Sequence, residues 1–234
     1  WDERHVDTRT RFEQRADESF VRITIDFDNP CDDQRVRVHV PLSEPADHSY
    51  AEGQFGIVER GLQPEGGYGE VAIPTYPASG FVSAGGVALL LDHVTEYEVA
   101  GDELALTILR STGLISRADN PWREDPAGPS VPIPAAQLHG VQSFSFAYCP
   151  AADDAVELAE LYRHPFLNAR GTASPQTELR THEGPLLEGD ASVVLTAFLP
   201  GRARMVNESA EPQTVRFAGA SIDLRPWEIH SVTL

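Results

Sequence analysis

Lysine is absent from this sequence. All 18 of its basic residues are arginine, against 36 aspartates and glutamates. The absence excludes a Schiff-base lysine and a P-loop lysine within the chain. A formal net charge of −18 repels phosphate backbones and anionic membrane surfaces, so we expect neither nucleic acid nor a membrane among its partners.

Cysteines and long apolar runs are also scarce. Cys31 and Cys149 are too few for a disulfide framework and lack the clustered spacing of a zinc site, so we expect two buried free thiols. The longest apolar run, "GGVALLL" at 85–91, is much shorter than the roughly 20 residues of a membrane span. The N-terminus "WDERHVDTRT" has no signal-peptide pattern. We therefore expect a cytoplasmic chain whose first residue lies inside a longer protein.

Alternation of apolar and polar residues predicts half-exposed antiparallel strands. The pattern occurs at 20–27, 35–40 and 141–148. The Asn-Pro-Cys-Asp-Asp segment at 29–33, between the first two strands, is typical of the turn of a hairpin or a meander.

Two continuous apolar runs, at 87–91 and 104–109, predict strands that are buried on both faces. Residues 92–103 bridge the two runs, and Gly101-Asp102 predicts a tight turn at the end of this bridge. The proline-rich stretch at 125–137 predicts an extended, irregular loop.

One helix is predicted, starting at an N-cap of Asp153 or Asp154 and stopping before Pro165. A polar Gly/Pro-containing passage at 167–190 then predicts a connection, and about five short strands follow it. The sequence thus predicts an all-β, mainly antiparallel protein. We expect a large β-sandwich at 1–170 and a smaller β domain at 171–234.

Two groups of residues have spacings that suit chemistry. His5 and Asp7 have the His-x-Asp spacing of metal ligands on a strand, but no further ligands lie nearby, so we do not predict a metal site there. Asp92, His93, Glu96 and Glu98 are candidates for a general acid and base. However, an acidic hairpin face in so acidic a chain needs no function.

His139 is the remaining histidine candidate, because it could pair with Glu96 or Glu98 across the sheet. Arg110 and Arg117 delimit the turn that follows the run at 104–109. They are expected to bond loop carbonyls or the acidic segment at 117–126. The alternative is contact with a sugar or a neighbouring domain. Weaker signals are the Asn207-Glu208-Ser209 sequon and the two tryptophans, Trp122 and Trp227, which we expect to be exposed.

Six blocks of sequence, in serial order, carry a resemblance to a known family. They are "FEQRADESFVRITIDFDNPCDDQRVRVHVPL", "FGIVERG", "YPASGFVSAGGVALLLDHVTEYEV", "LALTILRSTGLISR", "AGPSVPIPAAQLHG" and "LRPWEIHSVTL". Together they resemble the C-terminal half of family 38 glycoside hydrolases, the α-mannosidase group, over nearly the whole chain.

The resemblance implies a large mutarotase-like β-supersandwich followed by a smaller β domain. These would stand behind an N-terminal (β/α) barrel with a catalytic zinc and an aspartate nucleophile, and a helical bundle. The parent enzyme would hydrolyse terminal α-mannosides with retention, in mannose metabolism. The barrel and its zinc ligands would lie outside this chain, so we expect no catalytic residues, metal or cofactor in it and no activity of the chain alone.

The partners implied are the chain's own N-terminal catalytic domain and the carbohydrate substrate of the parent. Arg60, Arg110, Arg117 and His139 are then the candidates for contact with the carbohydrate or the domain interface. Arg110 and Arg117 would fix the loop that faces the catalytic part.

Two alternatives stay open. The first is a free-standing mutarotase-like sugar epimerase, which would use a Glu base and a His acid, with His139 and Glu96 or Glu98 as the pair. The second is a carbohydrate-binding module, in which Trp122, Trp227 or Tyr68 stacks on a pyranose ring. The low aromatic content, 8%, with no aromatic stripe, ranks the binding module after the epimerase.

Overall fold

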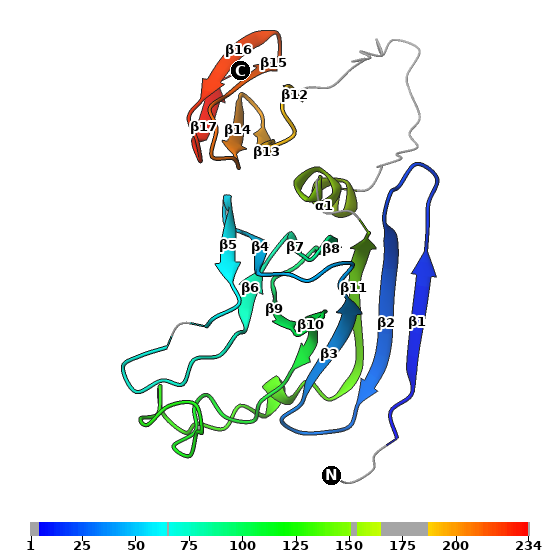
Figure 1. Ribbon diagram of the computed structural model, residues 1–234, viewed down its shortest axis with the longest axis vertical. Helices are drawn as coiled ribbons and strands as arrows, with labels where there is room; N and C mark the ends of the chain where they lie inside the picture. The colour runs from blue at the N-terminus through cyan, green and yellow to red at the C-terminus, as the bar shows by residue number, and fades with distance from the viewer. Residues whose placement is uncertain (1–4, 65, 151–153, 165–186, 234) are drawn as a thin grey trace. The chain divides into compact units, whose positions relative to one another are not determined.

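The computed structural model describes residues 5–64, 66–150, 154–164 and 187–233 (Figure 1). The chain divides into two units, one of residues 1–53 with 58–162 and one of residues 54–57 with 163–234. The predicted domain boundary between residues 170 and 171 falls outside the described residues.

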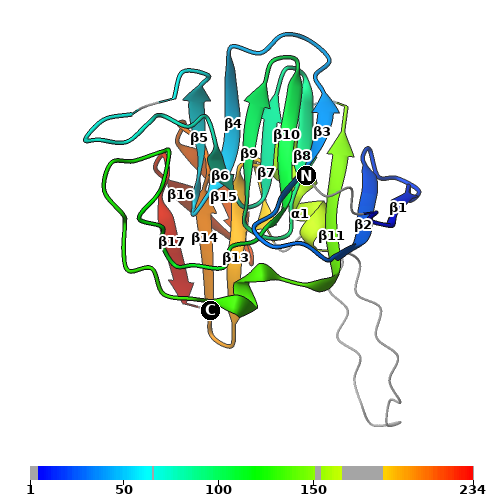
Figure 2. The ribbon, with the colours of Figure 1, turned by 90° about the horizontal axis from the view of Figure 1, so that it is seen from below.

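The larger unit contains two antiparallel sheets (Figures 1 and 2). The seven-stranded sheet has the order β1-β2-β11-β8-β7-β4-β5, and the four-stranded sheet has the order β3-β10-β9-β6. The bounds are β1 (Thr8–Glu13), β2 (Val21–Asn29), β3 (Arg35–Pro41), β4 (His48–Gly53), β5 (Gly56–Gly61), β6 (Tyr76–Ala78), β7 (Phe81–Ala84), β8 (Val87–Leu90), β9 (Thr95–Ala100), β10 (Glu103–Arg110) and β11 (Gly140–Cys149). The prediction of an all-β, mainly antiparallel fold is confirmed.

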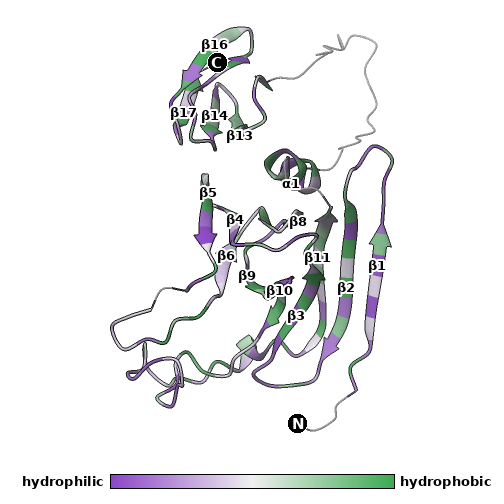
Figure 3. Ribbon diagram, viewed as in Figure 1, coloured by the Kyte–Doolittle hydropathy of each residue, from purple (hydrophilic) through white to green (hydrophobic). Residues whose placement is uncertain are grey.

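The core of this unit lies between the apolar faces of the two sheets. The four-stranded sheet contributes Tyr97 and Leu106, and the seven-stranded sheet contributes Leu89 and Phe146, all fully buried or nearly so. The alternation predicted for β2 and β3 is visible as changes of hydropathy along each strand (Figure 3). β8 is buried along its whole length and β10 along most of it, as their continuous apolar runs predicted.

The prediction for residues 29–33 is wrong. They do not close a hairpin or a meander, because β2 pairs with β1 and β11 whereas β3 pairs with β10 in the other sheet. The segment is a crossover between sheets. Asn, Pro and Asp favour a change of chain direction, and that local preference is the same whether the next strand joins the same sheet or the facing one.

The prediction for residues 92–103 was incomplete. This segment contains β9, which pairs with β10 around the predicted tight turn at Gly101-Asp102. Its charged residues alternate with buried ones, so β9 is a half-buried strand and the acidic side chains belong to its outer face.

The predicted helix is present as α1 (Ala155–Arg163), which ends before Pro165. The carbonyl of Asp154 accepts the Leu158 N–H at 3.0 Å and so begins the helix. Arg22 on β2 connects α1 to the sandwich. Arg22 forms a bidentate ion pair with Glu18 (2.9 and 2.8 Å) and donates to the Tyr162 carbonyl at 3.3 Å.

The same guanidinium stacks on two rings. Its carbon lies 5.2 Å from the Phe20 ring centroid and 4.9 Å from that of Tyr162, and the two rings meet edge to face. Burial, followed by the negative charge of Asp92, raises the pKa of Tyr162 to about 12. The Tyr162 phenol is therefore neutral at pH 7.

The smaller unit contains two three-stranded antiparallel sheets. One has the order β12 (Leu187–Glu188), β15 (Gln213–Phe217) and β16 (Ala220–Leu224), and the other β13 (Val193–Leu199), β14 (Arg202–Asn207) and β17 (Ile229–Thr233). Five of these strands were expected from the sequence. Its core contains Met205, Phe217 and Leu224.

The sequon asparagine lies in this smaller unit and is fully buried. Asn207 Nδ2 donates to the carbonyls of Glu211 (2.7 Å) and Arg225 (3.0 Å). Since its amide nitrogen is engaged in holding two turns, the sequon has a structural explanation.

Both cysteines are free thiols, but only Cys149 is buried. Cys31 is half-buried, because it lies on the crossover between the sheets. Among the described helices, none is both long and apolar enough to cross a membrane.

We expect Arg22→Ala to lower the free energy of unfolding by about 1–3 kcal/mol, because it removes a half-buried ion pair and two ring contacts together. Urea denaturation followed by fluorescence measures the loss. Arg9→Ala, on the exposed strand β1, is the control. Equal stability of the two variants would contradict this role of Arg22.

Candidate functional site

The four arginine and histidine candidates lie at different places in the larger unit. Arg110 ends β10, Arg117 lies in the loop after it, and His139 immediately precedes β11. Arg60 lies on β5, at the edge of the seven-stranded sheet. Arg110, Arg117 and His139 thus lie in or beside the segments that follow β10 and precede β11, whereas Arg60 lies on a separate strand.

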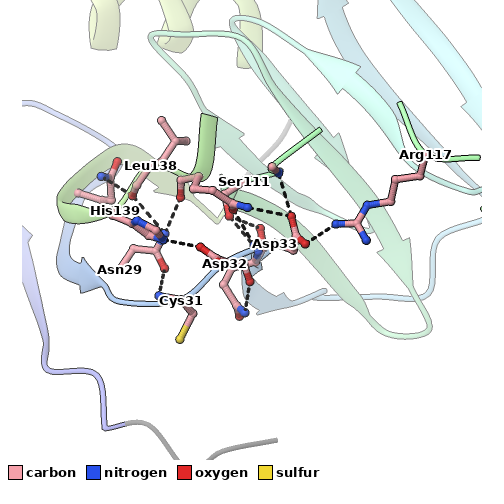
Figure 4. Close-up of polar contacts among 12 residues, drawn as sticks. Asn29, Cys31, Asp32, Asp33, Ser111, Arg117, Leu138 and His139 are labelled. Atoms are coloured by element: carbon pink, nitrogen blue, oxygen red, sulfur yellow. Dashed lines mark hydrogen bonds and ion pairs between the residues drawn. The ribbon is translucent and has the colours of Figure 1, made fainter. Parts of the chain in front are cut away.

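Three segments meet where β10 ends and β11 begins: the crossover at 29–34, the loop at 111–117, and a 3-10 turn (Pro134–Gln137) with the two residues after it. We call this meeting point the Asp33 junction (Figure 4). Asp33 is its centre, because one carboxylate oxygen accepts the Gly113 N–H at 2.9 Å and the Gln137 side-chain amide at 3.1 Å. The other oxygen pairs with the Arg117 guanidinium.

Buried polar side chains complete the Asp33 junction. Asn29 donates to the carbonyls of Gln137 (3.0 Å) and Leu138 (3.1 Å), and Gln137 Oε1 accepts the Asp33 N–H at 2.7 Å. The Ser111 hydroxyl accepts the Gln34 N–H at 2.8 Å. Asn29, Gln137 and Ser111 are all buried, so each of these bonds replaces water that has been removed.

The negative charge of the Asp33 junction lies on the Asp33 carboxylate. The Arg117 guanidinium, followed by the Gly113 N–H and the Gln137 amide, lowers the pKa of the Asp33 carboxyl below its ordinary value of 3.8. Arg117 therefore binds the crossover, whereas we had expected it to bond a loop carbonyl or the acidic segment at 117–126. The ion pair with Asp33 fixes the loop at 111–117 to the crossover at 29–34.

His139 also binds the crossover. Its Nε2 lies 2.7 Å from Asp32 Oδ1, and both side chains are exposed. The predicted pairing with Glu96 or Glu98 is wrong, because those two carboxylates are bound by arginines on the four-stranded sheet. A His–Glu acid–base pair of the kind required for an epimerase is thus not assembled from these residues.

A groove of about 520 Å³ lies beside the Asp33 junction. It is lined by His93, Val94, Thr95, Glu96, Thr107, Ile108, Leu109, Arg110, Leu138, Gln142, Ser143 and Phe144. The groove shares Leu138 with the junction, and the Gln142 amide donates to the Leu138 carbonyl at 3.0 Å. Its volume is in the usual range for a small-molecule site.

Glu96 is the anchored charge of this groove. Its carboxylate binds Arg35 at 2.8 Å, Arg110 at 3.0 Å and the Thr107 hydroxyl at 3.1 Å. Three donors bind this carboxylate, so it positions the two guanidinium groups. Arg110 is the exposed member, with 73% of its side chain accessible to solvent.

A β-bulge explains why Arg110 reaches Glu96. In the pairing of β10 with β3, Thr107 lies opposite Arg37 but Leu109 lies opposite Val36, so one extra residue is accommodated at 108. Regular alternation would put Arg110 on the opposite face from Thr107. The bulge brings both to the outer face, where Arg110 lies opposite Arg35 and Glu96 neutralises the two like charges.

The other acidic and histidine candidates form local pairs. Glu98 is bound to Arg37, and Asp92 is bound to the adjacent His93, whose ring packs edge to face against Phe144 with the centroids 4.5 Å apart. The structure thus brings His93 and Glu96 to one groove, while Glu98 belongs to a separate ion pair. His5 lies 3.1 Å from Asp7 on the exposed N-terminal segment. Within the part of the chain that the structure describes, no three His, Cys, Asp or Glu residues are placed to hold a metal.

Arg60 donates a hydrogen bond to a buried hydroxyl group. It donates to the Tyr97 phenol at 3.3 Å and stacks on Tyr76, with 5.2 Å from its guanidinium carbon to the ring centroid. The Tyr97 hydroxyl also bonds Ser49 at 2.9 Å. Tyr97 is fully buried, so Arg60 satisfies a polar atom inside the core.

The sequence did not point to Asp33 or Gln137 as the centre of the site. A signal was present, because Asn29, Asp32 and Asp33 are three polar residues in a five-residue turn. Their partners lie about 80 to 108 positions away along the chain, beyond the reach of local patterns.

We expect Asp33→Asn to lower the midpoint of thermal unfolding at pH 7. Because the folded pKa of Asp33 is lowered, its contribution is complete above the ordinary pKa of about 4 and is lost as the pH falls through the lower folded value. The difference between wild type and variant should therefore shrink below pH 4. Thermal scans from pH 2.5 to 7 measure this, with Asp28→Asn on β2 as the control. A difference that is independent of pH would contradict the ion-pair argument.

Gly113→Ala should destabilise the larger unit. A Cβ at this position would lie 2.5 Å from the Gln137 amide nitrogen, so we expect the amide to shift away from Asp33. An unsatisfied buried amide costs about 1–3 kcal/mol, which thermal or urea unfolding detects. Gly128→Ala is the matched control, because its Cβ would meet only Ser116 at 3.9 Å. If the two variants are equally stable, Gln137 is not the constraint we describe.

Comparison with known proteins identifies the fold. No family model matches the chain, and no curated protein sequence matches it. Its structure is similar to that of an alpha-mannosidase from Enterococcus faecalis V583, with a TM-score of 0.63 and 19% identity. It is also similar to a protein in glycosyl hydrolase family 38 from Enterococcus faecalis, with a TM-score of 0.66 and 21% identity.

Both matches cover 96% of this chain but only 28% and 29% of the other two chains. The chain thus spans less than a third of the proteins it resembles. It has the fold of one part of these two longer proteins, one an alpha-mannosidase and the other in glycosyl hydrolase family 38.

Proposed function

We propose that this chain is the non-catalytic β-domain portion of a family 38 glycoside hydrolase of the α-mannosidase type. One observation carries the proposal: nearly the whole chain takes the fold of less than a third of an alpha-mannosidase and of a family 38 protein. The order of sequence blocks from 12 to 234 supports the same family independently. The zinc, the nucleophile and the acid/base of such an enzyme would belong to a catalytic barrel outside this chain.

The role proposed for the chain is structural and not catalytic. In the groove, Glu96 is held by two arginines and a threonine, and in the Asp33 junction the carboxylate is held by an arginine and two amides. These arrangements give loops a defined conformation without requiring a proton transfer. Arg110, which is mostly exposed, is the side chain best placed to contact the catalytic part or the edge of its sugar site.

A proton-NMR time course tests this function. The folded chain, with zinc added, is incubated in one tube with methyl α-mannoside and freshly dissolved α-mannose. We expect both signals to change at the rate of the protein-free control. The proposed parent enzyme, which would contain this chain together with the catalytic barrel, is expected to cleave the mannoside. It should release the α-anomer first, as retention requires.

Each arm of the experiment can contradict one part of the proposal. Cleavage or anomer exchange by the chain alone would show that it has its own active site. Failure of the longer protein to cleave any α-mannoside, while it is folded and loaded with zinc, would contradict the assignment of the parent activity.

A further inference from the structure

Two long loops of the larger unit hold each other in a defined conformation. One joins β5 to β6 and the other joins β10 to β11, and they run beside one another in Figure 1. The Val71 N–H donates to the Trp122 carbonyl at 2.7 Å, and the Glu124 N–H donates to the Gly69 carbonyl at 3.1 Å. Loops of this length with mutual backbone pairing are more often functional than incidental.

An aromatic ring is presented at the tip of the first loop. Tyr68 lies between Gly67 and Gly69, has a left-handed backbone (φ 54°), and its side chain is fully exposed. A bulky residue is disfavoured in this conformation, and the ring gains nothing from burial here. An aromatic side chain placed in this way offers a flat apolar face to a ligand.

A pocket of about 300 Å³ opens directly beside this ring. Its walls are Tyr68, Gly69, Glu70, Arg123, Glu124, Asp125 and Pro126. Arg123 pairs with Glu70 across the two loops. The Glu124 carboxylate lies against Gly69, since an oxygen of Glu124 would be 3.7 Å from a Cβ there.

The chemistry of these walls determines the class of ligand. An exposed ring matches the apolar C–H face of a pyranose, and carboxylates accept hydrogen bonds from its hydroxyl groups. The pocket has three carboxylates and one guanidinium, so its net negative charge repels anionic ligands. The volume is at the lower end of small-molecule sites and suits one sugar ring.

We propose that the pocket formed by Tyr68, Glu70, Arg123, Glu124 and Asp125 binds a neutral hexopyranoside. The sugar stacks on Tyr68 and donates its hydroxyls to the carboxylates. This site is distinct from the groove at Glu96 and needs no catalytic barrel. Binding can therefore be tested on this chain alone, and its outcome leaves the proposed parent activity untouched.

The test is a titration of the folded chain, followed by two-dimensional NMR in the presence of EDTA. The probes are methyl α-mannopyranoside and methyl α-glucopyranoside up to tens of millimolar, with mannose 6-phosphate as the anionic comparison. We expect saturable binding of at least one neutral glycoside with a Kd of roughly 1 mM. The phosphate is expected to bind more weakly than the neutral sugar.

Variants locate the site. Tyr68→Ala should weaken binding about tenfold through loss of the stacking surface, while Tyr68→Phe should bind within about twofold of wild type. Tyr50→Ala, on a partly exposed tyrosine of β4, is the matched control and should bind normally. The proposal is overturned if no neutral glycoside binds, if Tyr68→Ala binds like wild type, or if the anionic sugar binds best.

Discussion

Hydrogen bonds and an ion pair at Asp33 hold the first connection between the two sheets of the larger unit, the crossover at 29–34 from β2 to β3. A crossing loop at a sandwich end has backbone and side-chain polar groups that lose water when the sheets pack. Asp33 meets this demand by binding a guanidinium, a backbone N–H and a side-chain amide from two other segments. The Asp33 junction thus ties the connection between β2 and β3 to the segments that follow β10 and precede β11.

Arginine performs the same task throughout this chain, in place of lysine. Arg22 forms a bidentate pair and stacks on two rings, Arg60 stacks on Tyr76 while it binds the Tyr97 hydroxyl, and Arg110 shares Glu96 with Arg35. A planar group with several fixed donors can do this, whereas a point charge on a flexible stem cannot. Structural positioning therefore accounts for the arginines in the larger unit that drew attention in the sequence.

Local sequence patterns predicted the secondary-structure elements well, but they predicted poorly which side chains contact one another. The sequence predicted the alternation at β2, β3 and β11, the buried runs at β8 and β10, and the helix α1. Each of these patterns is visible within a short stretch of consecutive residues. Strands β1 and β4–β7 carry weaker patterns, and β1 is exposed along its whole length. The site was foreseen only in part: Arg110, Arg117 and His139 do lie at one end of the sandwich, but with unexpected partners.

By itself the sequence determined the all-β class, the apolar faces that build the core, the abundance of fixed cations paired with carboxylates, and the two-part organisation around one short helix. These follow from composition and from periods of two or 3.6 residues. The tertiary structure alone decided that residues 29–34 cross between sheets and that a bulge at residue 108 turns Arg110 toward Glu96. It also decided that Tyr68 stands beside Arg123. Each of these depends on pairing between strands or loops distant in sequence, and a one-residue change of register reverses the face on which a side chain lies.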